Sequence, residues 1–154
     1  MKTSEPILFD TNVLVYNQDQ DSIHYKEAAF FHKKTLSQEI TAVVSSQNLL
    51  EFAAVITNPK KIVRPLSQKL ADLEIEKYLK TSFFIIIYPN EKSLSLFTGL
   101  FKKYHLGNAK QAFDLFLIAI MLANDVRTIL TANYKDFEKF KEIRVVKLYS
   151  SKKE

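Results

Sequence analysis

Three isolated acidic residues stand beside strongly apolar segments of the sequence. Asp10 directly follows the apolar run 7–9, Glu51 is the one charged residue between positions 47 and 58, and Asp114 lies between two large apolar residues. Burying an ionised carboxylate in apolar surroundings costs several kcal/mol unless a partner compensates it, and carboxylates that meet also repel one another. If the fold brings these acids together, lysine or arginine side chains or a hard divalent cation must balance their charge.

A fourth polar segment could contribute to the same site. Residues 131–137, with the sequence TANYKDF, follow another apolar run and supply Asn133 and Asp136. The chain has no cysteine and only three histidines, which excludes a thiolate zinc site and a cysteine nucleophile. Because the available ligands are oxygen atoms, the favoured cations are Mg²⁺ or Mn²⁺.

Each of these residues also has a purely structural interpretation. Asp10 and Asp114 could be helix N-caps, because aspartate is a favoured capping residue. Glu51 could extend to solvent or pair with a lysine, whereas Asn133 and Asp136 could build a turn. The joint pattern of acids beside apolar runs favours a shared site over five separate structural roles.

The elements that must position these acids alternate between two types. Short runs rich in β-branched or aromatic residues predict strands at 7–9, 42–44, 83–88, 128–130 and 144–148. Longer segments with helical spacing predict helices at 23–36, 47–56, 67–80, 92–104 and 111–124. This alternation favours an α/β fold, a three-layer α/β/α sandwich around a central parallel sheet.

Two of the predicted helices are apolar around most of their circumference. We expect helices 47–56 and 111–124 to be buried, with caps supplied by Ser46 and Asn108. In open parallel sheets, ligands bind beyond the carboxyl ends of the strands, where the strand order reverses. The acids are therefore expected to meet at that edge of the sheet.

Composition narrows the class of protein further. The 154 residues suit one domain, expected at 1–149 and followed by a basic, frayed tail at 150–154. Two glycines are too few for a phosphate-binding P-loop or a dinucleotide-binding fingerprint. The absence of cysteine, of a membrane-length apolar run and of a signal peptide predicts a cytoplasmic protein, and a net charge of +5 favours a polyanionic partner.

Four segments in order resemble the motifs of the PIN-domain nucleases. They are ILFDTNVLV at 7–15, SQNLLEF at 46–52, FDLFLIA at 113–119 and TANYKDF at 131–137. The resemblance implies a PIN-like fold and an Mg²⁺- or Mn²⁺-dependent ribonuclease directed at single-stranded RNA. It also implies RNA as substrate, a homodimer, and most often the role of the toxin in a VapC-type toxin–antitoxin pair, with a cognate antitoxin as partner.

The resemblance also assigns roles by position. Asp10, Glu51 and Asp114 would be the metal-binding acids. Asn133 occupies the fourth motif position, where other members carry aspartate, and Asp136 could supplement it. The residues that could orient ligands or touch the phosphate are Thr11, Asn12, Ser46 and Thr131. The residues that could hold the RNA backbone or stack on a base are Lys60, Lys61, Arg64, Lys110, Tyr16 and Tyr134.

Three other functions fit parts of this pattern. A PIN nuclease could process cellular RNA without any antitoxin, and sequence alone does not separate it from a toxin. A non-catalytic RNA-binding module could retain the fold after losing one metal site, for which Asn133 is the single hint. A phosphatase or response-regulator-like domain also gathers acids at strand ends, but the first strand is followed by no pair of acids.

Overall fold

A five-stranded parallel sheet forms the centre of the molecule, and Asp10 directly follows its middle strand. The computed structural model describes residues 4–151. The strands are β1 (Ile7–Phe9), β2 (Ala42–Ser45), β3 (Phe84–Ile87), β4 (Thr128–Thr131) and β5 (Arg144–Lys147). Their order is β3-β2-β1-β4-β5, with Leu8 opposite Val43 on one side and opposite Ile129 on the other.

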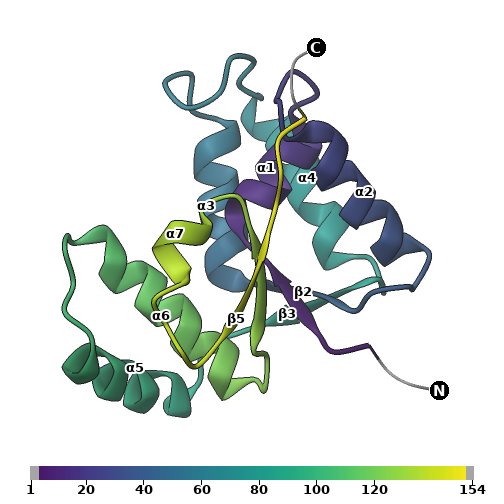
Figure 1. Cartoon of the computed structure of the whole chain (residues 1–154). Coiled ribbons are helices and arrows are strands. Elements are labelled where there is room, and N and C mark those ends of the chain that lie inside the picture. Colours follow the sequence, from purple (N-terminus) through teal and green to yellow (C-terminus); the bar gives the residue numbers. More distant parts are fainter. Residues whose placement is uncertain (1–3, 152–154) are drawn as a thin grey trace.

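Helices cover both faces of this sheet, as Figure 1 shows. One face packs against α1 (Thr11–Gln18), α2 (Tyr25–Leu36), α3 (Ser46–Ile56) and α4 (Gln68–Leu79). The other face packs against α5 (Glu91–Lys103), α6 (Lys110–Ala123) and α7 (Tyr134–Phe137). Within each strand the buried side chains alternate, so that Phe9 joins the first core and Leu8 the second. The predicted three-layer α/β/α sandwich is confirmed.

All five predicted strands and all five predicted helices form, with ends within two residues of the predicted ones. The prediction missed two short helices, α1 and α7. Helix α1 begins directly after Asp10, whose side chain accepts a hydrogen bond from the Thr11 backbone N–H. Its centre contains Val13 and Val15, which are buried, so tertiary packing outweighs the β-branched preference for extended backbone.

The start of α3 differs from the prediction in its capping residue. Ser45, and not Ser46, is the N-cap, and its hydroxyl accepts the backbone N–H of Asn48 at 3.0 Å. Ser46 is instead the first residue of the helix. Near the start of α6, Asn108 accepts the backbone N–H of Gln111 at 3.2 Å, although Ala109 directly precedes the helix. Asn108 therefore accepts a hydrogen bond from the first turn of α6, as predicted, but from the position before the N-cap residue.

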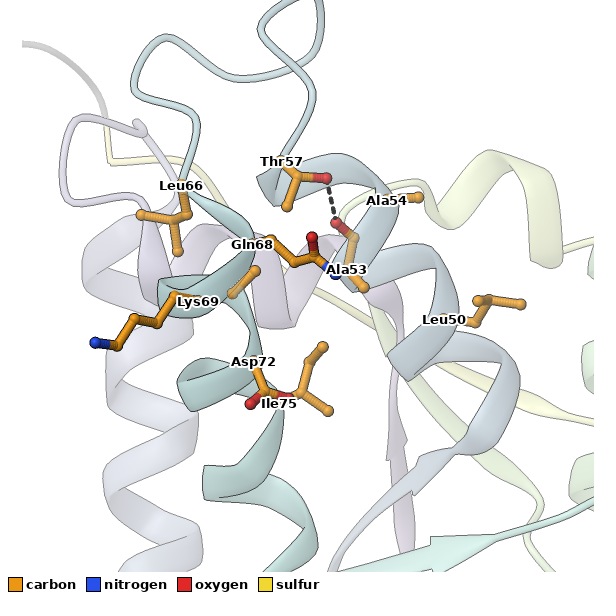
Figure 2. Close-up of a pocket in the computed structure, with 10 residues that line it drawn as sticks. Leu50, Ala53, Ala54, Thr57, Leu66, Gln68, Lys69, Asp72 and Ile75 are labelled. Carbon is orange, nitrogen blue, oxygen red and sulfur yellow. Dashed lines mark hydrogen bonds between the residues drawn. The ribbon is translucent and has the colours of Figure 1, made fainter.

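The expectation that both apolar helices are buried is only partly correct. Leu117 to Met121 of α6 are buried, whereas Phe113 at its start is 64% exposed. In α3, Leu50 is 73% exposed, because α1 and the sheet cover one side of the helix and leave the opposite side open. Figure 2 shows the groove beside this open face, between α3 and α4, with Leu66 and Ile75 along it.

The chain ends bear on two further predictions. The predicted tail 150–154 lies partly outside the described residues, and within them Ser151 donates through its backbone N–H and its hydroxyl to the carbonyl of Ile23. This one residue of the predicted tail is thus hydrogen-bonded to the domain. Between residues 4 and 151, no helix has the length and apolar character that crossing a membrane requires.

Candidate active site

The strand order reverses between β1 and β4, and a cavity opens beyond the carboxyl ends of these strands. The cavity has a volume of about 480 Å³. Asp10 reaches it from the end of β1, Glu51 from α3, and Asp114 from the first turns of α6. Asn133 and Asp136, which follow β4, line it as well. The structure therefore brings together five side chains that are up to 126 positions apart in the sequence.

Asp10 is the most deeply buried of these acids and the most fully hydrogen-bonded. Its Oδ2 accepts from the Thr131 hydroxyl at 2.7 Å and from the Asn12 amide at 2.9 Å, and its Oδ1 accepts from the Thr11 backbone at 2.8 Å. Burial raises the pKa of Asp10 above its ordinary value, while these donors act in the opposite direction. Asp10 is also the N-cap of α1, so the structural and the candidate site interpretations coincide in one residue.

Glu51 lies at the exposed rim of the cavity and is oriented by two neighbours. Its Oε2 accepts from the Thr11 hydroxyl at 3.0 Å, and its Oε1 accepts from the Gln47 amide at 3.1 Å. The same amide of Gln47 also donates to the carbonyl of Phe113, next to Asp114. Gln47 thus connects α3 to the start of α6, a contact that the sequence did not reveal.

Asp114 carries the clearest sign of a missing partner. Its Oδ2 is buried and accepts no hydrogen bond. Burial raises the pKa of Asp114 to about 6, the charge of Lys110 lowers it, and the charges of Asp10, Asp136 and Glu51 raise it. Unlike Asp10, Asp114 lies inside its helix and is not an N-cap.

Lys110 is a positive charge within the acid cluster. Its Nζ lies 3.1 Å from Oδ2 of Asp136, and this hydrogen bond raises the pKa of Lys110. Asp136 is therefore not a simple turn residue, because it lies in α7 and pairs across to α6. Lys110 and Lys61 line the cavity together with four carboxylates, so the lining carries a net negative charge when these acids are ionised.

The remaining predicted residues divide into two groups. Thr11, Asn12, Tyr16 and Lys61 line the cavity, and Thr131 lies fully buried behind Asp10. The predicted residues that do not line it are Ser46, Lys60, Arg64 and Tyr134. Arg64 instead pairs with Asp21 at 3.1 Å, and Lys147 covers the ring of Tyr134 at 4.0 Å. Tyr16 stacks on His24, so one face of its ring is already occupied.

The donor chemistry of the cavity suits a divalent cation. Carboxylate and amide oxygens line it, and the Asp114 oxygen that lacks a partner is an available ligand. Among residues 4–151, however, no three histidine or acidic side chains are spaced to hold an ion as they stand. Ligation by all three acids therefore requires at least one of them to move, and the Asp114 carboxylate has an oxygen that no hydrogen bond holds in place.

Another cavity of the described chain is the groove between α3 and α4, about 1200 Å³ in volume. Figure 2 shows Ile75 on the α4 side of this groove and, at the end of α3, the Thr57 hydroxyl, which donates to the carbonyl of Ala53. Asp72 is the one acid that lines this groove, and a single carboxylate does not form a comparable cluster.

Solved structures with the same fold include chains from toxin–antitoxin systems. A chain of VapBC2 from Rickettsia felis, bound to promoter DNA, is 20% identical with a TM-score of 0.64, covering 92% of this chain and 98% of its own. A chain of a toxin–antitoxin complex from Klebsiella pneumoniae is 21% identical with a TM-score of 0.60, and the match covers 94% of this chain and 98% of that one. The sarcin-ricin loop cleaving toxin VapC20 of Mycobacterium tuberculosis is 12% identical with a TM-score of 0.59, and the match covers 90% of this chain and 98% of that one.

Sequence comparison identifies the family independently of these structures. A search of curated proteins finds no match to this chain. The PIN domain family model matches residues 7–143, which include all four motif segments and every strand except the last four-residue one. The match covers far more than half of the sequence and coincides with the elements that build the cavity. The chain therefore belongs to the PIN domain family.

Proposed function

We propose that this protein is an Mg²⁺- or Mn²⁺-dependent endoribonuclease that hydrolyses phosphodiester bonds in single-stranded or loop RNA. The observation that carries the proposal is the cavity shared by Asp10, Glu51 and Asp114, which come from three different elements. Membership of the PIN domain family supports a nuclease. The +5 charge of the chain supports a polyanionic substrate.

The three acids share one role in this proposal. Asp10, Glu51 and Asp114 would hold the cation, which when bound stabilises negative charge on the phosphate and lowers the pKa of water. Thr131, Asn12 and the Thr11 backbone hold Asp10 in place through three hydrogen bonds. The unpaired Oδ2 of Asp114 is the carboxylate atom most available to a ligand or to an attacking water.

The substrate backbone would be held by lysines at the cavity. Lys61 and Lys110 both line it and present ammonium groups to a phosphate. Lys110 pairs with Asp136, so it can exchange between this carboxylate and an incoming phosphate. Asn133 offers a carbonyl oxygen in place of a carboxylate, which predicts a weaker second metal position, supplemented by Asp136.

The test is RNA cleavage by Asp10→Asn and Asp114→Asn in Mg²⁺ or Mn²⁺, with thermal unfolding measured on each variant. We expect both to lose at least about 100-fold in rate while remaining folded. Asp72→Asn is the matched control, because Asp72 is an acid in the groove of Figure 2, away from the cluster. Wild-type rates in both cavity variants would remove these acids from catalysis.

We further propose that the protein is the toxin of a toxin–antitoxin pair, with a cognate antitoxin and a homodimeric state. The toxin–antitoxin complex from Klebsiella pneumoniae and VapBC2 from Rickettsia felis, which share this fold, support an antitoxin. Expression of this chain should arrest growth, and co-expression of a neighbouring short gene should relieve the arrest. Growth arrest that no neighbour relieves would favour an RNA-processing nuclease without an antitoxin.

One observation favours a second function, a catalytically degenerate RNA-binding module. Asn133 provides no charge at the fourth motif position, and Lys110 already neutralises Asp136. A calorimetric Mn²⁺ titration separates the two functions. A nuclease site should bind Mn²⁺, whereas a degenerate module should give no heat above dilution.

A further inference from the structure

Asn48 is a fully buried polar residue that does not line the cavity, yet it connects to it. It lies one helical turn before Glu51 in α3 and is 0% exposed. Its Oδ1 accepts from the Ser45 backbone at 3.3 Å and from the Ser45 hydroxyl at 2.7 Å. These bonds, together with the Ser45 cap, form a capping box at the start of α3.

The main chain fixes which way the amide of Asn48 points. A backbone N–H can only donate, so the atom that faces the Ser45 N–H must be the amide oxygen. The amide nitrogen then faces the opposite way, where it donates to the Thr11 hydroxyl oxygen at 3.1 Å. Asn48 thereby presents a donor, and never an acceptor, to Thr11.

This arrangement also determines the direction of the Thr11 hydroxyl. Because its oxygen accepts from Asn48, its single hydrogen is directed to another acceptor, and Oε2 of Glu51 lies 3.0 Å away. Thr11 is only 8% exposed, so water does not readily replace either partner. A chain of donors therefore runs from Ser45 through Asn48 and Thr11 to Glu51.

The second carboxylate is held by the same construction. The Ala132 backbone donates to Oδ1 of Asn12 at 3.1 Å, which directs the Asn12 amide nitrogen to the Thr131 hydroxyl at 3.1 Å. Thr131 also accepts the Asn133 backbone N–H and donates its hydrogen to Asp10 at 2.7 Å. Two asparagine–threonine pairs, each oriented by the main chain, thus hold two of the candidate ligands.

We propose that Asn48 is a positioning residue of the active site, which acts through the Thr11 hydroxyl to hold the Glu51 carboxylate in its ligating orientation. This inference rests on the proposed function. Glu51 is exposed and would otherwise sample several rotamers, so ordering it in advance reduces the entropy lost when it binds a cation. Asn48 itself touches neither the cation nor the substrate.

The test is a double-mutant cycle of Asn48→Ser and Thr11→Val, read as Mn²⁺ affinity by calorimetry. Serine at position 48 should keep the capping box, because Ser93 serves in the same position of α5, where its hydroxyl accepts the Asn90 backbone at 2.9 Å. Serine is too short to reach Thr11. We expect Asn48→Ser to weaken Mn²⁺ binding about tenfold, and the double variant to bind no more weakly than Thr11→Val.

Two further variants separate positioning from folding. Ser93→Ala removes the equivalent buried capping residue of α5, so it should lower the melting temperature and leave Mn²⁺ affinity unchanged. Thr11→Ser keeps the hydroxyl and should retain the affinity that Thr11→Val loses.

Several results would overturn the inference. They are wild-type Mn²⁺ affinity in Asn48→Ser, additive losses in the double variant, or an equal loss of affinity in Ser93→Ala. A wild-type protein that binds no Mn²⁺ would instead overturn the proposed function, and the inference with it. The two failures are distinguishable because the first is measured relative to a wild-type protein that does bind the ion.

Discussion

Hydrogen-bond satisfaction differs sharply between the acids of the cavity. Asp10 accepts three hydrogen bonds and Glu51 accepts two, whereas Oδ2 of Asp114 has no partner although it is buried. An unsatisfied buried polar atom costs about 1–3 kcal/mol, so its presence in a well-packed domain calls for a compensating ligand. Asp114 is therefore the acid that can bind a cation through an oxygen without giving up an existing hydrogen bond.

The raised pKa of Asp114 predicts how Mn²⁺ affinity depends on pH. A carboxylate must lose its proton to ligate a metal, and burial raises the pKa of Asp114 to about 6. Below about pH 6 the proton competes with the ion, so affinity should fall by about tenfold per pH unit through this residue. Calorimetric titrations from about pH 7.5 to 5 measure this, and a flat profile would contradict it.

The residues of the site differ in how visible they are in the sequence. Asp10, Glu51 and Asp114 are recognisable in the sequence because a lone acid in an apolar segment is costly to bury without a partner. All three line the cavity. Asn48 and Gln47 gave no comparable signal, because polar residues at a helix start are usually caps. Their contacts to Thr11 and Phe113 depend on the packing of α3 against α1 and α6.

At the scale of elements, hydrophobic period and length explain most of what the sequence could predict. Strands and long helices carry repeating patterns, whereas α1 has eight residues, two of them valines at its centre, and α7 has four. Such segments are too short to form a helix alone, and tertiary contacts decide their conformation. The Asp10 cap and the burial of Leu14 supply these contacts for α1.

The packing of α2 against α4 predicts a loss of stability in mild acid. Buried His32 contacts the Ala28 carbonyl and the Tyr78 hydroxyl, while Glu74 and Lys77 of α4 line the cavity beside it. Desolvation lowers the pKa of His32 from 6.5 to about 4. The unfolded chain therefore binds this proton first, and stability falls as pH drops from about 6.5 to about 4, by about 3 kcal/mol in total.

Urea unfolding of the wild type and of His32→Gln, at pH values from about 7 to 4.5, measures how much of the loss of stability comes from His32. Asp114 titrates in the same range with the opposite sign, but it contributes equally to both proteins. The difference in the free energy of unfolding between the wild type and His32→Gln should therefore decrease as the pH falls. Parallel curves would show that His32 does not titrate as a buried neutral residue.

At the scale of the whole molecule, topology explains why the site lies where it does. Strand order β3-β2-β1-β4-β5 reverses beside β1, so residues after β1 and β4 meet at one edge without a connection crossing between them. The alternation of strand and helix predicted the parallel sheet, and the rule for open sheets predicted this edge. The apolar pattern of a helix does not predict which of its faces remains exposed to solvent. Leu50 on α3 is the clearest example, because it is apolar and yet exposed.

The positive charge of the molecule predicts that its affinity for RNA depends on salt concentration. Lysines at the cavity should contribute to this dependence, and lysines far from it should not. Lys61 lines the cavity, whereas Lys92 lies in the first turn of α5. The start of α5 is near the end of α6 that lies away from the cavity, because Asn124 at that end donates to the carbonyl of Tyr88. Each phosphate contact contributes about 0.7 to the slope of log affinity against log salt for single strands. Lys61→Gln should lower that slope by about this amount, and Lys92→Gln should not.

Fluorescence anisotropy with a short single-stranded RNA, in an Asp10→Asn background that prevents cleavage, measures both slopes. Equal slopes for the two lysine variants would indicate that RNA binds through diffuse surface charge and not at the cavity.

Anomalous diffraction from crystals grown with Mn²⁺ shows whether Asp10, Glu51 and Asp114 share one divalent cation. The prediction is an anomalous peak in the cavity beyond β1 and β4, at about 2.0–2.3 Å from a carboxylate oxygen of at least two of these residues, with Oδ2 of Asp114 among the ligands or joined to the ion by one water. A peak elsewhere, or none at a saturating Mn²⁺ concentration, would contradict it.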